Sequence, residues 1–81
     1  MYYVYILQSK KDCKYYVGYT SDLESRVEYH NSGRQRSTKH RIPFKLIYYE
    51  EFKTRTEALR REREIKNFKG GNLFHKLLEG V

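Results

Sequence analysis

The sequence predicts a small α+β domain in which helices flank a three-stranded antiparallel sheet, with strands and helices in the order ββαβαα. Two runs rich in β-branched and aromatic residues lie close together near the amino terminus, and a third lies in the middle of the chain. Two patterns of a hydroxyl residue followed by glutamate three positions later introduce helical stretches. A chain of 81 residues has room for one such domain with a thin core.

The first two strands are expected at Tyr2 to Gln8 and Lys14 to Tyr19, because these runs consist mostly of tyrosine, valine and isoleucine. The polar stretch SKKDCK separates them. A short polar connection of this kind is typical of a hairpin, so the two strands should pair with each other in antiparallel fashion.

A first helix is predicted over about Leu23 to Asn31. Ser21 begins the sequence SDLE, in which Glu24 follows three residues later as in a capping box, and Gly33 can end the helix. The polar and basic stretch GRQRSTKHRIP comes next. Long loops in small domains are often functional, which makes this loop a candidate binding region.

The stretch FKLIYYEEF, residues 44–52, has the β-branched and aromatic content of a third strand. Thr54 and Glu57 then repeat the capping-box pattern. A second helix should therefore begin near Arg55 and run to about Phe68.

The last part of the chain predicts a short third helix. Gly70 and Gly71 interrupt the second helix, and residues 72–79 have the apolar spacing of an amphipathic helix. We find no linker, repeat or low-complexity tract. One domain is therefore expected over residues 1–81, with its motif-bearing part at about 1–70.

Composition favours a polyanionic partner. The chain has 17 lysines and arginines against 10 acids, a formal net charge of +7. Such a surplus on a small surface favours nucleic acid over a merely basic soluble protein. The one cysteine, Cys13, cannot form an internal disulfide, and neither a secretory signal nor an apolar run of membrane-spanning length is present. We therefore expect a cytoplasmic location.

Two potential cations border the apolar side of the first helix. At about 100° per residue, Arg26 and His30 fall beside the stripe formed by Leu23 and Val27, and they are four residues apart on one face. Either the arginine extends over the edge of the core and a backbone carbonyl satisfies the histidine, or the pair faces an anionic or hydrogen-bonding ligand.

The second helix places an acid on its apolar side. Glu62 lies within the stripe of Ala58 and Ile65, whereas Glu64 points away from it. A carboxylate in that position needs a partner, which could be an arginine from elsewhere in the fold or a metal ion.

Further basic residues could follow a phosphate backbone, although a run of charges is most often a solvated face. The candidates in the long loop and the second helix are Arg34, Arg36, Lys39, Arg41, Arg61 and Lys66.

The triplets YVY at residues 3–5 and YVG at residues 16–18, with Arg26, His30 and Glu62 downstream, resemble the GIY-YIG nuclease domain superfamily and its small stand-alone, UPF0213-like members. The resemblance covers nearly the whole chain. In the first triplet, tyrosine and valine replace the glycine and isoleucine of the family, and the final tyrosine, Tyr5, is kept.

The resemblance implies a metal-dependent endonuclease that hydrolyses DNA phosphodiester bonds with one Mg²⁺ or Mn²⁺. Glu62 would hold the ion, Arg26 would neutralise the scissile phosphate, and His30 would orient a hydroxyl or the phosphate. Tyr16 would be the general base, with Tyr5 in the same network. Because an unperturbed phenol ionises near pH 10, the proton could instead pass to a metal-bound hydroxide or be relayed without full ionisation.

Gly18 is typical of a bulge or of a close approach by another group, and a side chain there could intrude on the site. Only one acid is expected to face inward, which excludes a two-metal nuclease.

Two alternatives remain open. The chain could be a weakly active or non-catalytic nucleic-acid-binding module derived from a nuclease, as an accessory to a repair protein. It could also be a structural protein in which Glu62 pairs with Arg26. The sequence contains no separate DNA-targeting domain, so a partner protein could supply specificity.

Overall fold

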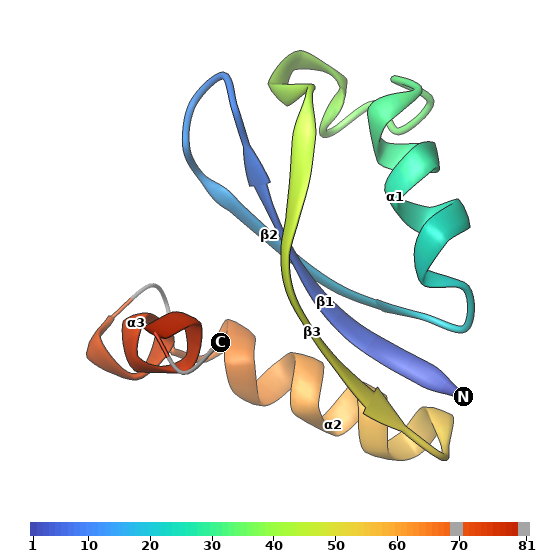
Figure 1. Cartoon of the computed structure of the whole chain (residues 1–81), viewed down its shortest axis with the longest axis vertical. Helices are drawn as coiled ribbons and strands as arrows, with labels where there is room; N and C mark the ends of the chain where they lie inside the picture. The colour runs from blue at the N-terminus through green and yellow to red at the C-terminus, as the bar shows by residue number, and fades with distance from the viewer. Residues whose placement is uncertain (69–70, 80–81) are drawn as a thin grey trace.

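The computed structural model describes residues 1–68 and 71–79 and confirms the predicted α+β fold and its element order (Figure 1). The three strands form one antiparallel sheet in the order β2-β1-β3. Its elements are β1 (Tyr2–Ser9), β2 (Tyr15–Thr20), α1 (Leu23–Asn31), the 3₁₀ turn η1 (Lys39–Arg41), β3 (Phe44–Phe52), α2 (Arg55–Lys66) and α3 (Asn72–Glu79).

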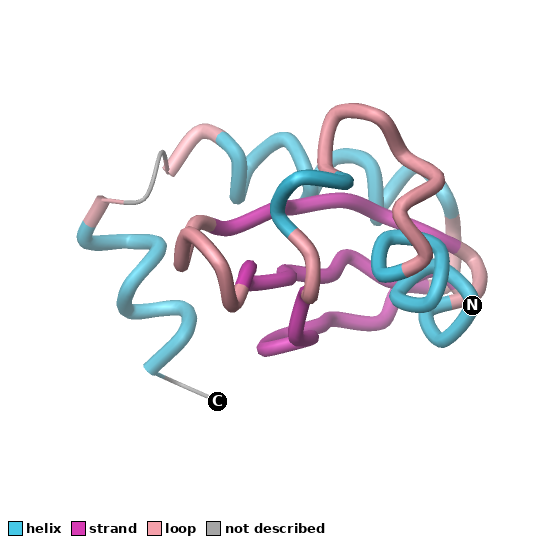
Figure 2. Tube along the Cα trace, turned by 90° about the horizontal axis from the view of Figure 1, so that it is seen from above, coloured by secondary structure: helices cyan, strands magenta, loops and turns pink. Residues whose placement is uncertain are grey.

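The central strand β1 divides the core into two parts, because its side chains alternate between the faces of the sheet. Val4 and Ile6 pack with residues of α2 and α3, whereas Tyr5 and Leu7 pack on the side of α1. Figure 2 shows the three strands running side by side with the helices arranged around them. Any group reached from both α1 and α2 must therefore lie at an edge of the sheet.

Helix α1 has the predicted bounds, but the residue that caps it differs from the prediction. The Asp22 carboxylate, rather than the Ser21 hydroxyl, accepts the Ser25 N–H at 3.2 Å, and it also accepts the Ser25 hydroxyl at 2.9 Å. A carboxylate can take both bonds at once, and its charge is favourable at the amino end of a helix. Gly33 follows the helix with φ of 78°, as its predicted role in ending the helix requires.

Helix α2 confirms the second capping box. Thr54 accepts the Glu57 N–H at 3.2 Å, and its hydroxyl lies 3.0 Å from the Glu57 carboxylate. The helix ends at Lys66, two residues earlier than predicted, because the Phe68 N–H turns back to the Ile65 carbonyl in a tighter turn. The predicted break at Gly70 lies outside the described residues.

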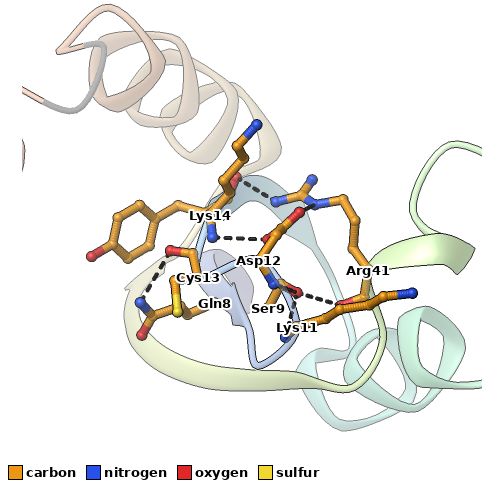
Figure 3. A network of polar contacts seen from close by, with 8 residues as sticks. Gln8, Ser9, Lys11, Asp12, Cys13, Lys14 and Arg41 are labelled. Atoms are coloured by element: carbon orange, nitrogen blue, oxygen red, sulfur yellow. Dashed lines mark hydrogen bonds and ion pairs between the residues drawn. The ribbon is translucent and has the colours of Figure 1, made fainter.

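The long loop is more ordered than the sequence predicts, because it contains η1 and is tied to the β1–β2 turn (Figure 3). Arg41 donates to the Asp12 carboxylate at 3.0 Å and to the Tyr15 carbonyl at 3.3 Å. The Ser9 hydroxyl donates to the Arg41 carbonyl at 2.5 Å. The loop and the hairpin therefore hold each other in place.

Over residues 1–68 and 71–79, no helix combines the length and the apolar character needed to cross a membrane.

Candidate active site

The site begins with a pair of residues on neighbouring strands. Tyr5 on β1 lies directly opposite Gly18 on β2. A β-carbon at position 18 would lie 2.5 Å from the Tyr5 hydroxyl oxygen and 2.7 Å from the ring carbon that carries it. Glycine is therefore required here because the Tyr5 phenol occupies the space of a side chain.

The Tyr5 hydroxyl is bonded to a histidine from α1. Its oxygen lies 3.1 Å from His30 Nε2, and both side chains are buried. Tyr16 completes an aromatic cluster, since its ring centre lies 4.6 Å from that of His30 and 6.4 Å from that of Tyr5. Three residues from β1, β2 and α1 thus form one packed unit.

Burial keeps this hydrogen-bonded pair neutral. Desolvation, helped by the neighbouring Tyr16, raises the pKa of the Tyr5 phenol well above its usual value. Desolvation also lowers the pKa of His30, and the positive charge of Arg26 acts in the same direction. Within the described residues, His30 Nδ1 is buried and makes no hydrogen bond. Tyr5 is therefore suited to donating or accepting a hydrogen bond, and unsuited to acting as an ionised base.

A cleft of about 430 Å³ opens beside this cluster. Tyr5, Tyr16 and Arg26 line it from the α1 side of the sheet, whereas Glu62 reaches it from α2 on the other side. The cleft therefore crosses the sheet edge at β2. Its lining residues are Tyr2, Tyr5, Tyr16, Val17, Tyr19, Thr20, Ser21, Arg26, Arg55, Glu62 and Lys66.

Glu62 is nearly buried, with 9% of its surface exposed, as its place in the apolar stripe predicts. Its carboxylate pairs with Lys66 Nζ at 3.2 Å, one turn further along α2. Neither Arg26 nor any other arginine of the described chain forms this ion pair, so the structural alternative of a Glu62–Arg26 pair does not hold. The Lys66 side chain is 54% exposed. Glu64 points outward and pairs with Arg61 instead.

The donor set suits one hard divalent cation. Glu62 supplies a carboxylate at the wall of the cleft and would hold the ion, and Tyr5 and Tyr16, which line the same cleft, would offer hydroxyl groups to the water around it. Mg²⁺ commonly takes one or two carboxylates and keeps several waters. Residues 1–68 and 71–79 contain no group of three His, Cys, Asp or Glu side chains that could hold a metal ion together. A site in which protein side chains supply most of the ligands is therefore not favoured.

The predicted nucleic-acid-binding residues fall into two groups. Arg34, Arg36 and Lys39 are exposed, and Lys66 lines the cleft. Arg41 is instead bound to Asp12 of the hairpin turn.

Arg61 is also engaged by protein groups. It makes ion pairs with Glu50 and Glu64, and the hydrogen bond to Glu50 is the main reason why its pKa is raised. Arg41 and Arg61 thus have structural partners that the sequence did not reveal.

The cleft also contains a tyrosine–arginine contact that the sequence did not predict. Tyr19 and Arg55 line it, and the Tyr19 hydroxyl accepts two hydrogen bonds from the Arg55 guanidinium, each 3.2 Å long. Alternation along β2 could have placed Tyr19 on the α2 side. Arg55 lies two helical turns before Glu62, on the same face, which was also visible in the sequence.

Comparison with known proteins agrees with this geometry. The family model of the GIY-YIG catalytic domain matches residues 1–73, which include the cleft residues of the two strands, α1 and α2. The chain belongs to the GIY-YIG family. This membership indicates a nuclease-type function and confirms the resemblance noted in the sequence.

Relatives of similar size share this domain. UPF0213 protein SSP2268 of Staphylococcus saprophyticus is 42% identical over 80 residues, which cover 98% of this chain and 96% of that protein. UPF0213 protein HQ_3675A of Haloquadratum walsbyi is 46% identical over 68 residues, or 83% of this chain and 75% of the relative.

A solved structure is also similar. The solution NMR structure of the UPF0213 protein BH0048 from Bacillus halodurans has a TM-score of 0.62 and 37% identity, and the match covers 98% of this chain and 84% of that one.

Proposed function

We propose that this GIY-YIG protein is an endonuclease that hydrolyses DNA phosphodiester bonds with the help of a single divalent ion, Mg²⁺ or Mn²⁺. The observation that carries the proposal is the cleft itself, in which Tyr5, Tyr16, Arg26 and Glu62 converge from opposite sides of the sheet. Two phenols, a guanidinium and one carboxylate are the groups needed to deprotonate water, neutralise a phosphate and hold a cation.

The two tyrosines are suited to different tasks. Tyr5 is buried, bonded to His30 and kept neutral, so it orients groups in the cleft through its hydroxyl. Tyr16 is half-buried and lines the cleft, where it can take or relay the proton of the attacking water. His30 contributes by fixing the Tyr5 hydroxyl from behind.

The two charged residues act on the phosphate. Arg26 lines the cleft, and no carboxylate of the described residues pairs with its guanidinium. Its positive charge is therefore available to neutralise the negative charge that develops on the phosphate. Glu62 would hold the divalent ion, which when bound polarises the phosphate and stabilises the leaving oxygen. The exposed Lys66 side chain can leave Glu62 and turn toward a phosphate.

The proposal is tested by cleavage of labelled flap, fork, four-way-junction, single-stranded and supercoiled DNA with Mg²⁺ or Mn²⁺. Glu62→Gln should abolish metal-dependent nicking. Its melting temperature should stay close to that of the unaltered protein, because the ion pair lost involves a largely exposed lysine and contributes little. Glu64→Gln is the matched control, since it removes an exposed acid from the same helix.

Equal DNA binding by all three proteins without cleavage would instead support a non-catalytic nucleic-acid-binding module that serves a repair protein. A large loss of stability in Glu62→Gln would contradict the metal-holding role and favour a structural one. A cytoplasmic location and a partner protein that supplies specificity stay predictions.

A further inference from the structure

One part of the cleft has no task in the reaction described above. Arg55, the first residue of α2, is exposed at the cleft, and its Nε and one terminal nitrogen both donate to the Tyr19 hydroxyl at 3.2 Å. The guanidinium carbon also lies 5.9 Å from the centre of the Tyr19 ring. The Arg55 side chain is therefore held in one place by an uncharged partner.

The held guanidinium still has unused hydrogen-bond donors. Two of its five N–H groups bond to Tyr19, and the other three bond to no group of residues 1–68 and 71–79. In the described part of the chain, no carboxylate forms an ion pair with Arg55, in contrast to Arg41 and Arg61. A planar, charged fork with free donors matches the oxygens of a phosphate.

The charge of the cleft favours the same ligand. Among the residues that the structure describes, Arg26, Arg55 and Lys66 line it together with one acid, Glu62. Glu62 is already matched by Lys66. An excess of positive charge in a concave site attracts anions, and a chain of phosphates supplies one for each cation.

The spacing along α2 places Arg55 near Glu62, the residue proposed to hold the ion. Arg55 and Glu62 are seven residues apart, so they lie on the same face of the helix about 10 Å apart along its axis. We propose that Arg55, positioned by Tyr19, binds a backbone phosphate close to the scissile one on the same strand. The proposal rests on the nuclease function proposed above.

The contact is tested by measuring the binding of a fluorescent DNA duplex by anisotropy over a range of salt concentrations. EDTA is present to remove divalent ions, so that binding is measured without cleavage. Arg55→Gln should bind roughly tenfold more weakly and lower the slope of log affinity against log salt by about one. Arg60→Gln is the matched control: it removes the same charge from the same helix, but Arg60 lines a groove outside the cleft. That variant should bind almost as tightly as the unaltered protein.

Tyr19→Phe keeps the aromatic ring and removes the oxygen that holds Arg55. A smaller loss of affinity is expected, and it should disappear when Arg55 is already glutamine, because both changes affect one contact. Additive losses would overturn the positioning role of Tyr19. Circular dichroism of each variant verifies that it is folded.

A scan of single uncharged methylphosphonates along a cleaved strand then locates the phosphate. The unaltered protein should lose affinity when one particular phosphate near the cut is replaced, and Arg55→Gln should lose none at that position. If Arg55→Gln and Arg60→Gln behave alike while metal-dependent cleavage persists, the phosphate contact is wrong and the nuclease function stands. If neither the unaltered protein nor any variant binds or cleaves DNA, both proposals are wrong.

Discussion

At the scale of single residues, the site depends on the absence of a side chain at Gly18. The Tyr5 phenol occupies the space in front of Gly18, and this allows its hydroxyl to reach His30. The sequence predicted that a side chain at Gly18 could intrude on the site. The structure adds that the group it would strike is the Tyr5 hydroxyl itself.

Gly18→Ala should destabilise the protein by about 1–3 kcal/mol, because the new methyl group overlaps the Tyr5 side chain. Urea unfolding measures the loss. In a Tyr5→Ala background, where the whole phenol ring is absent, the same change should cost clearly less. Equal costs in the two backgrounds would show that the overlap with the Tyr5 side chain does not determine the requirement for glycine.

At the scale of elements, α2 carries much of the proposed chemistry on one face. Arg55, Glu62 and Lys66 project from it toward the cleft, while Ala58 and Ile65 fix it to the sheet. The first turn of this helix must be well formed for Arg55 to stay at the cleft. The Thr54 capping box supplies that order.

Thr54→Ala should lower the free energy of unfolding by about 1 kcal/mol, because the Glu57 N–H loses its acceptor at the start of α2. Thermal unfolding of Thr54→Ala is compared with that of Thr56→Ala, an exposed threonine in the same helical turn. Similar losses in the two variants would mean that removing any threonine side chain from this turn has the same effect, and that the bond from Thr54 to the Glu57 N–H adds no stability.

At the scale of the whole molecule, the fold brings three layers to one sheet edge. The cleft lies where α1, β2 and α2 meet, and one of its lining residues is Tyr5, whose hydroxyl forms a neutral pair with the buried His30. This pair connects the global stability of the protein to pH, since unfolding exposes His30 to water.

The free energy of unfolding should be greatest above about pH 6.5 and should decrease as the pH falls toward the lowered pKa of His30. In that range the unfolded chain binds a proton on His30 that the folded chain excludes, and the slope reaches at most about 1.4 kcal/mol per pH unit. His30→Gln should flatten the dependence, measured by urea unfolding from pH 5 to 8. His40→Gln, which alters an exposed histidine, should leave the slope intact; a slope that persists in His30→Gln would contradict the assignment.

The sequence by itself determined the order of the elements and the inward direction of His30 and Glu62. These features follow from local rules, because a strand alternates every two residues and a helix repeats every 3.6. The pairing of Glu62 with Lys66 was also within reach of local rules, as an i,i+4 pair.

Only the tertiary structure decided which groups meet across the sheet. The bond of Tyr5 to His30, the attachment of Arg41 to Asp12 and the contact of Arg55 with Tyr19 join residues 25 to 36 positions apart. The periodicity of a strand or helix predicts which side of that element a residue faces. It does not predict which residue of another element lies opposite. The cleft depends on both, because it forms where the α1 side and the α2 side of the sheet meet at the edge of β2.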